Sequence, residues 1–345
     1  MNRKMSSRMT CALAKSLRGA LASCALASMC AAPSQAASEP AQRMVGDYPY
    51  KPIRIIDSFA AGGSTDYMAR VLGQKITERF GQPVIVDNRS GAAGNLAAEL
   101  VAKATPDGYT LLMAVLPALA PSATLYPRLG YDVLKDFAYV TLIAAGTYVV
   151  VVNPASPAHS LNELIALAKA RPGQISYGSS GVGGPLHLAG ELLKSRTGAN
   201  ILHVPYKGAA PVVAAVAGGE VQVGFASLSG ALPMIKAQRL TALAVTSARR
   251  AKAFPELPTI AESGFPGFDV TPWYGILIPA ATPAPIVGAL NTELGKVLQA
   301  PDIQASFLAQ GLEATGSTQE RFKAIMQSEI EKWAKVIKDA GIKAE

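Results

Sequence analysis

Cysteine is almost absent from this chain of 345 residues, and its three cysteines (Cys11, Cys24 and Cys30) all lie within the first 36 residues. That segment also carries five basic residues and no acid, then the apolar run 19–32, and it ends in Ser34-Gln35-Ala36. This order is typical of a cleaved secretory signal peptide, so we expect residues 1–36 to be removed and the protein to be periplasmic. The remaining chain would have no thiol, which excludes a disulfide, a zinc–thiolate site and a cysteine nucleophile.

A large charge excess and long apolar runs are also missing once the leader is set aside. The net charge falls from +8 to +3, with 27 Lys and Arg against 24 Asp and Glu, so nucleic acid is not an expected partner. No stretch beyond the leader approaches the roughly 20 apolar residues of a membrane span. Leu21-Ala22-Ser23-Cys24 matches a lipoprotein box, but Lys15 and Arg18 interrupt the apolar run that such a signal needs upstream.

Signatures of cofactors, metals and catalysis are missing as well. After Gly181-Val182-Gly183-Gly184 the dinucleotide fingerprint would need glycine at position 186, where Leu186 stands. The three histidines are too dispersed to form a metal-ligand pattern. No G-x-S-x-G sequence supports a nucleophile elbow. We therefore expect no cofactor, no metal and no enzymatic activity.

Apolar strands alternate with helical patterns in two series along the chain. The expected strands are 53–58, 84–87, 109–114, 139–143 and 148–153, then 175–178, 201–204, 221–226, 240–245 and 274–278. Continuous apolar strands that alternate with helices predict mostly parallel sheets covered by helices on both faces. We expect two α/β domains, residues 46–146 with 275–345 and residues 147–274, joined by a crossing near 144–148 and a return strand at 274–278.

Capping patterns place several of the helices between these strands. Asn95 is predicted to cap one helix, and S/T-x-x-E boxes begin others at Ser160, Thr259 and Ser317. The segment 116–136, with three prolines, is predicted to be irregular.

Three loops of small residues follow predicted strands and precede predicted helices: 60–63, 91–94 and 179–184. Ligands of open α/β sheets bind at this edge, where backbone N–H groups and the helix dipole favour an anion. Any one of these loops could merely make a tight turn, but three across two domains favour a shared anion site in an interdomain cleft. The pattern indicates a carboxylate or phosphate without naming it.

For several side chains near these loops, the sequence allows both a structural role and a role in ligand binding. Asp66 is most simply a cap or dipole partner. His187 either faces the cleft or packs structurally, whereas His203 ends an apolar strand and is read as structural. Tyr206 could face the cleft with a hydroxyl group and a flat aromatic ring, and Lys207 is read as a surface charge. Trp273 and Tyr274 either line the pocket or brace the hinge.

An ordered set of motifs then resembles one family. These are Tyr48-Pro49-Tyr50-Lys51-Pro52-Ile53-Arg54, Phe59-Ala60-Ala61-Gly62-Gly63-Ser64-Thr65-Asp66, Gly81-Gln82-Pro83-Val84-Ile85-Val86-Asp87-Asn88-Arg89, Pro106-Asp107-Gly108-Tyr109-Thr110-Leu111-Leu112, Tyr177-Gly178-Ser179-Ser180-Gly181, Val204-Pro205-Tyr206-Lys207-Gly208 and Leu257-Pro258-Thr259-Ile260-Ala261-Glu262-Ser263-Gly264. Together, from about residue 46 to the end, they resemble the Bug-type extracytoplasmic solute receptors of tripartite tricarboxylate transporters.

The resemblance implies a two-domain, Venus-flytrap, type II-like periplasmic binding protein that holds a small carboxylate mainly with backbone amides and hydroxyls. Carried over residue by residue, the ligand-binding set is Phe59, Ala60, Ala61, Gly62, Gly63, Ser64, Asp66, Ala93, Gly94, Asn95, Ser179, Ser180, Gly181, Gly183, His187, Tyr206 and Ala226. Many relatives carry an aspartate at the position of Ala226 that can meet a ligand ammonium group. Its absence favours a di- or tricarboxylate or an aromatic acid over an amino acid.

The expected function is capture of an organic acid and its delivery to membrane permease subunits. One alternative is a periplasmic sensor that presents its ligand to the ectodomain of a sensor kinase. Another, from a different class, is a secreted hydrolase or isomerase that uses His187 or Asp66.

Overall fold

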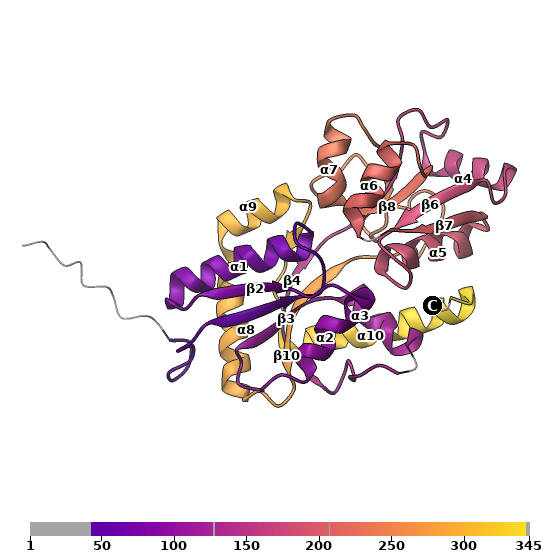
Figure 1. Cartoon of the computed structure of the whole chain (residues 1–345). Helices are drawn as coiled ribbons and strands as arrows, with labels where there is room; N and C mark the ends of the chain where they lie inside the picture. The colour runs from indigo at the N-terminus through magenta and orange to yellow at the C-terminus, as the bar shows by residue number, and fades with distance from the viewer. Residues whose placement is uncertain (1–42, 127, 207, 343–345) are drawn as a thin grey trace, which may run out of the picture. The chain divides into compact units, whose positions relative to one another are not determined.

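The computed structural model describes residues 43–126, 128–206 and 208–342. The predicted signal peptide, with its three cysteines, and Lys207 therefore lie outside the described residues. In the described part, helices flank two separate sheets, as Figure 1 shows. The predicted organisation, two α/β domains with helices flanking each sheet, is confirmed.

The first sheet has the strand order β11-β4-β10-β3-β1-β2. Its strands are β1 (Ile53–Asp57), β2 (Val84–Asn88), β3 (Thr110–Val115), β4 (Phe137–Ala145), β10 (Trp273–Pro279) and β11 (Glu313–Ala314). With its helices α1 (Ser64–Phe80), α2 (Asn95–Ala102), α3 (Leu116–Leu125), α8 (Ala284–Gln299), α9 (Pro301–Ala309) and α10 (Gln319–Ala340), and the 3₁₀ turn η1 (Ala92–Gly94), we call it the first lobe.

The second sheet has the order β7-β6-β8-β5-β9. Its strands are β5 (Tyr148–Val152), β6 (Ile175–Ser179), β7 (Ile201–Pro205), β8 (Val223–Ser227) and β9 (Thr241–Val245). With α4 (Leu161–Ala170), α5 (Pro185–Thr197), α6 (Ala209–Ala217) and α7 (Leu228–Lys236) it forms the second lobe.

Both sheets are mixed, because the strands that connect the lobes run against their neighbours. In the first sheet β10 is antiparallel to β3 and β4, and β11 is antiparallel to β4. In the second, β5 is antiparallel to β8 and β9. The remaining strands of each sheet share one direction, which is the parallel set that the apolar pattern predicted. The predicted domain limits remain a prediction; β10 begins at Trp273, inside the range assigned to the second domain.

Side chains alternate between the two faces of each sheet. Leu111 and Met113 of β3 face α1, α8 and α9, whereas Leu112 and Ala114 face α2, α3 and α10. In the second lobe α4 and α5 cover one face, and α6 and α7 cover the other. Burial on both faces explains why these strands are apolar throughout rather than alternating.

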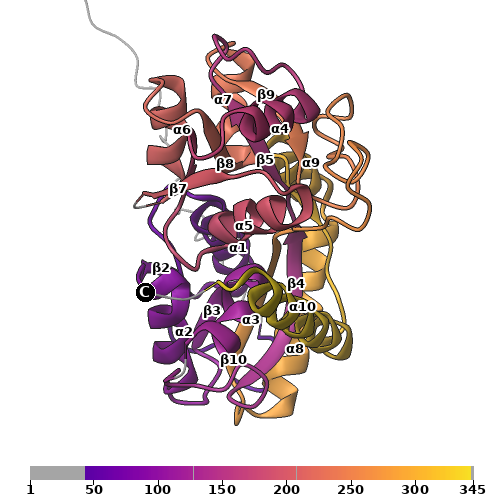
Figure 2. The ribbon, with the colours of Figure 1, turned by 90° about the vertical axis from the view of Figure 1, so that its right-hand side faces the viewer.

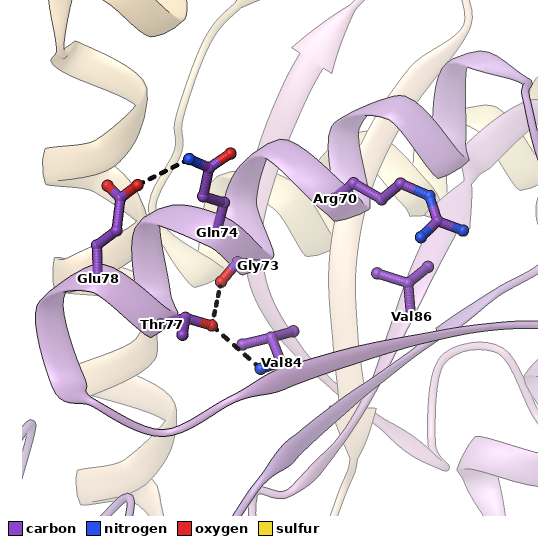
Figure 3. A pocket seen from close by; sticks show the side chains of 7 residues that line it. All are labelled: Arg70, Gly73, Gln74, Thr77, Glu78, Val84 and Val86. Atoms are coloured by element: carbon purple, nitrogen blue, oxygen red, sulfur yellow. Dashed lines mark hydrogen bonds between the residues drawn. The ribbon is translucent and has the colours of Figure 1, made fainter. Parts of the chain in front are cut away.

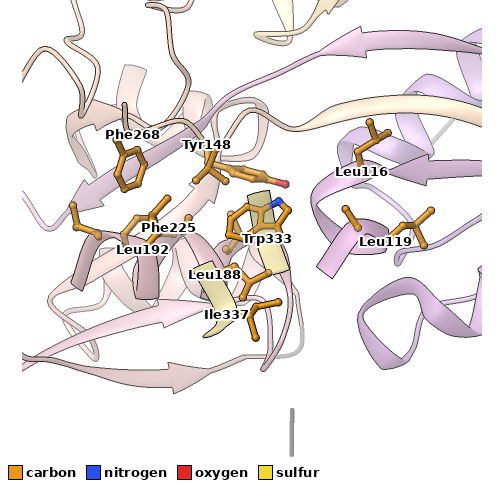
Figure 4. Close-up of a cluster of buried hydrophobic side chains, with 14 of the residues drawn as sticks. Leu116, Leu119, Tyr148, Leu188, Leu192, Phe225, Phe268, Trp333 and Ile337 are labelled. Carbon is orange, nitrogen blue, oxygen red and sulfur yellow. The ribbon is translucent and has the colours of Figure 1, made fainter. Parts of the chain in front are cut away.

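Helix α10 joins the cores of the two lobes. It packs on α3 and β4 of the first lobe and also contacts α5 of the second, beside which it lies in Figure 2. Its Trp333 is fully buried and belongs to one continuous core with Leu188 of α5 and Phe225 of β8 (Figure 4). Helix α10 therefore packs on both lobes.

The segment 116–136 was predicted to be irregular, and this prediction is wrong because α3 occupies Leu116–Leu125. Pro117 is tolerated in the first turn, where N–H groups have no helical partner. Pro121 lies inside the helix, and burial of α3 against α10 outweighs its cost. Helix α7, which follows β8, had not been predicted; Pro233 within it obscured the pattern.

Three capping assignments also differ from prediction. Gly94 rather than Asn95 is the N-cap of α2, and Thr318 rather than Ser317 caps α10. Thr259 and Glu262 form both hydrogen bonds of a capping box, but only a turn follows, since Gly264 and Pro266 come next. The Ser160 box is confirmed, with Ser160 accepting from the Glu163 N–H at 3.2 Å. No helix in the described ranges is long and apolar enough to cross a membrane.

Candidate functional site

The first-lobe loop, which we define as residues 58–63, connects β1 to α1. The buried side chains of Asp57 and Asp66 accept hydrogen bonds from backbone N–H groups of this loop. The Phe59 N–H donates to Asp57 Oδ1 at 3.2 Å, and the Gly62 N–H donates to Asp66 Oδ2 at 3.0 Å. No acceptor in the described part of the chain is hydrogen-bonded to the N–H groups of Ala60, Ala61 or Gly63. These residues are exposed, so their amides can serve a ligand.

The two carboxylates differ in charge state. Burial raises the pKa of Asp57 to about 7, and the charge of Asp66 adds to this, against hydrogen bonds from Thr65, the Phe59 N–H and Asn88. For Asp66, hydrogen bonds from Arg70 and the Gly62 N–H outweigh partial burial and lower the pKa. Asp66 is therefore an ionised scaffold for the loop, which agrees with its prediction as a local partner of the helix start.

The glycine-rich loop 91–94, which precedes α2 in the first lobe, packs against the first-lobe loop. A Cβ added at Gly94 would be 3.2 Å from Ser58 Cβ and 3.8 Å from the Phe59 ring, so Gly94 allows the two loops to touch. Ala93 is half-buried with a φ of +53°. Both ends of the buried Asn95 amide bond within the protein: its Nδ2 donates to Ala92 O at 2.7 Å, and its Oδ1 accepts from Tyr131 OH at 2.6 Å.

The second-lobe loop, residues 179–184, connects β6 to α5 and is held by side chains of a different kind. Ser179 Oγ lies 2.6 Å from His203 Nε2 and accepts from the Gly181 N–H at 3.2 Å. His187 Nδ1 accepts from the Gly183 N–H at 3.1 Å. His187 and Ser179 are buried, and Ser180 and Gly181 are half-buried.

Tyr206 and Ala226 have contrasting positions. The Tyr206 N–H donates to Ser179 O at 2.9 Å, and its half-buried ring lies against Gly178, so Tyr206 stands beside the second-lobe loop. Ala226 has no exposed surface and belongs to the core between the second sheet and α6 and α7. In this structure its side chain packs in the core and does not face the loops.

The lobes meet where helices α1 and α7 begin. Ser64 Oγ, in the first turn of α1, lies 2.6 Å from Ser229 Oγ, in the first turn of α7. On the other side, a Cβ added at Gly183 would lie 3.2 Å from the hydroxyl of Tyr126, which follows α3. The start of α1 in the first lobe thus contacts the start of α7 in the second, and the second-lobe loop lies against the end of α3.

Ser229 and Tyr126 were missed from the sequence. Ser227 caps α7 by accepting from the Gly230 N–H, and Leu228, Ala231 and Leu232 are buried at helical spacing. That spacing was a signal for α7, and hence for Ser229. Nothing local predicted the contact with Ser64, because 165 residues separate the two.

Tyr274 of the return strand is buried, and a hydrogen bond with Ser64 partly offsets the rise that burial causes in its pKa.

A separate hollow of about 350 Å³ lies between α1 and the edge strand β2, lined by Arg70, Gly73, Gln74, Thr77, Glu78, Val84 and Val86 (Figure 3). None of the predicted ligand-binding residues lines it. Among the described residues, no group of three or more His, Asp or Glu side chains could hold a metal ion.

Two mixed α/β lobes that meet where α1 and α7 begin have the architecture of a bilobal solute-binding protein, the class to which periplasmic receptors belong. Residues 68–342 match the model of the tripartite tricarboxylate transporter family receptor. The chain belongs to this family, and the Bug-type resemblance of its motifs is confirmed.

Relatives and solved structures agree with this assignment. The chain is 39% identical to protein BugT of Bordetella pertussis over 297 residues, which is 86% of this chain and 91% of BugT. The structure of R. palustris Rpa4515 with adipate has a TM-score of 0.82 and 36% identity, over 86% of this chain and 99% of that one. MatC (Rpa3494) from Rhodopseudomonas palustris with bound malate has a TM-score of 0.78 and 28% identity, over 84% and 100% of the two chains.

Proposed function

We propose that this protein is an exported receptor that captures a small dicarboxylate between its lobes and delivers it to the membrane subunits of a tripartite tricarboxylate-type permease. Capture is reversible and includes no chemical step. The observation that carries the proposal is the meeting of two helix N-termini, those of α1 and α7, at the Ser64–Ser229 contact.

Each helix N-terminus has the positive end of its dipole and unpaired N–H groups in its first turn. Two such ends repel each other in the absence of a counter-charge. An anion between them would remove that repulsion and accept hydrogen bonds from both lobes. The available donors are the amides of Ala60, Ala61 and Gly63 and the hydroxyls of Ser64 and Ser229.

The second-lobe loop and Tyr206 supply the opposite wall. We include Ser180, Gly181 and Gly183 in the proposed site, with Ser179 and His187 as its support. Asn95 and Ala226 are left out because their side chains are committed to the protein. A dicarboxylate is favoured because the two relatives named above hold adipate and malate, and because two separate groups of donors suit two carboxylates.

Thermal-shift screening and isothermal titration test the proposal. A panel of linear and branched dicarboxylates, tricarboxylates and aromatic acids should contain at least one compound that raises the melting temperature and binds with one-to-one stoichiometry, because a ligand that binds only the folded state stabilises it. The bound compound should be recovered unchanged. Failure of a broad organic-acid library, with folded protein, would overturn the proposal, and turnover of the ligand would replace it with an enzyme.

A further inference from the structure

Two stacked histidine rings support the second-lobe loop. The rings of His187 on α5 and His203 on β7 lie with their centroids 4.1 Å apart and their planes at 29°. His187 holds the Gly183 end of the loop through the Gly183 N–H, and His203 holds its first residue through Ser179 Oγ. Each ring thus fixes one end of the same short loop.

The hydrogen bond to Gly183 needs an uncharged His187 ring, and the stacking disfavours a charge on both rings at once. A histidine nitrogen accepts a hydrogen bond only when it carries no proton, so His187 Nδ1 must be unprotonated to accept from the Gly183 N–H. Two charged rings at stacking distance would also repel each other strongly in a buried environment. Burial, followed by the neighbouring His187, lowers the pKa of His203 to about 4.

The surrounding groups do not remove this constraint. Glu191 Oε1 lies 3.9 Å from His187 Nε2, but it also accepts from Tyr177 OH at 2.7 Å and from Lys194 Nζ at 2.8 Å, so its charge is shared. Helix α10, which packs on α5, contributes the apolar Trp333 and Ile337 to this core, with Glu329 bonded to the Trp333 Nε1–H. On the loop side, the titratable groups include Tyr126, whose hydroxyl lies close to Gly183, and Tyr206, which stands beside the loop.

We propose that His187 and His203 are positioning residues that hold the second-lobe loop in its ligand-binding shape only while both rings are neutral, so that acidification opens this half of the site. Protonation of His187 at Nδ1 would place two N–H groups against each other and release Gly183. This inference rests on the proposed function, because it assigns a pH response to the same site.

The first experiment needs no ligand. Protein labelled with ¹⁵N-glycine and ¹³C-histidine is titrated by NMR from pH 7.5 to pH 4. In the wild type the Gly183 amide shift should move together with the His187 ring signals. In His187→Asn, whose amide oxygen can take the place of Nδ1 without titrating, the Gly183 shift should stay flat. A Gly183 signal that is flat in the wild type while His187 titrates would overturn the inference.

The second experiment measures binding of adipate, or of the best acid from the screen, over the same pH range. His187→Leu and His203→Leu should weaken binding at pH 7.5 by about tenfold, the cost of an unmet buried hydrogen bond. His187→Asn and His203→Gln should recover most of this loss and flatten the fall in affinity at acid pH. His159→Gln, at the exposed third histidine, should keep the wild-type profile.

The outcomes separate the two proposals. If no acid binds at any pH but the Gly183 amide follows His187, the loop switch holds and the receptor function fails. If binding is normal and the conservative variants keep the wild-type pH profile, the receptor function holds and the histidine switch is wrong.

Discussion

The first-lobe loop is held by two carboxylates, Asp57 and Asp66, whereas the second-lobe loop is held by two imidazoles and a serine hydroxyl. Burial moves the pKa of Asp57 up to about 7 and that of His203 down to about 4. Both groups are therefore neutral between these values. The comparison teaches that each lobe uses an ionisable residue as an uncharged internal support, and that Asp57 becomes charged above about pH 7 whereas His203 becomes charged below about pH 4.

The largest expected effect comes from a charge at the meeting point of the lobes. Ser229→Asp would place a carboxylate at the start of α7, where it stabilises the helix but occupies the proposed anion position. We expect ligand affinity to fall by about 100-fold through like-charge repulsion, while the melting temperature stays the same or rises. Ser90→Asp, at an exposed position, is the control. Retained binding in Ser229→Asp would contradict a site between the two helix starts.

The helices that follow the two loops approach their sheets at different distances. A Cβ added at Gly190 of α5 would lie 2.3 Å from the Tyr177 ring, whereas one at Gly73 of α1 would lie 3.0 Å from Val84 Cγ1. Gly190→Ala should therefore lower the free energy of unfolding by about 2 kcal/mol through overpacking. Gly73→Ala should cost under about 1 kcal/mol, because the better helix propensity of alanine offsets a milder clash. Urea denaturation measures both, and equal costs would contradict the difference in packing.

The pH dependence of stability should have opposite signs in the two lobes. The folded-state pKa of Asp57 is raised, so its ionisation destabilises the fold as the pH rises from about 4, the unfolded value, to about 7. The folded-state pKa of His203 is lowered, so stability is lost as the pH falls from about 6.5 to about 4.

Asp57→Asn should remove the first dependence. The free energy of unfolding of the variant minus that of the wild type should be about 1–2 kcal/mol larger at pH 8 than at pH 5. Urea denaturation at pH 5 and at pH 8 measures the change. His203→Gln is the matched control, which should still lose stability as the pH rises. If Asp57→Asn also loses stability with rising pH, another group causes that loss.

The smallest effect is expected for the hydroxyl contact itself. Ser64→Ala and Ser229→Ala each remove one side of a partly buried hydrogen bond, which is worth about 1 kcal/mol. Each variant should weaken ligand binding by a few-fold. The double variant should lose less than the sum of the two, because the residues share one interaction. Strict additivity by calorimetry would mean that the two serines act independently.

Much of the fold could be predicted from local patterns. Apolar runs marked the sheets, and the small-residue loops 60–63 and 179–184 marked where α1 and α5 begin. Helices α3 and α7 were missed because their internal prolines oppose helix formation, and only burial by distant segments outweighs that cost.

The proposed site was visible in the sequence only in part. The glycine-rich loops predicted both halves of the proposed site, but the supporting groups Asp57, His203 and Ser229 depend on contacts between distant segments. Asn95 and Ala226 look suitable in sequence. Their commitment to Tyr131 and to the second-lobe core can be seen only in the structure.

Trp333 lies in a core shared by both lobes and bonds to Glu329 at 3.0 Å. A change in how the two lobes pack on each other would alter the surroundings of this indole, so its emission should report on the arrangement of the lobes. The chain contains two tryptophans, the other being Trp273. A Trp273→Phe variant would therefore keep Trp333 as its single tryptophan, in the core shared by both lobes, so a ligand-induced rearrangement of the lobes could be followed without an attached dye.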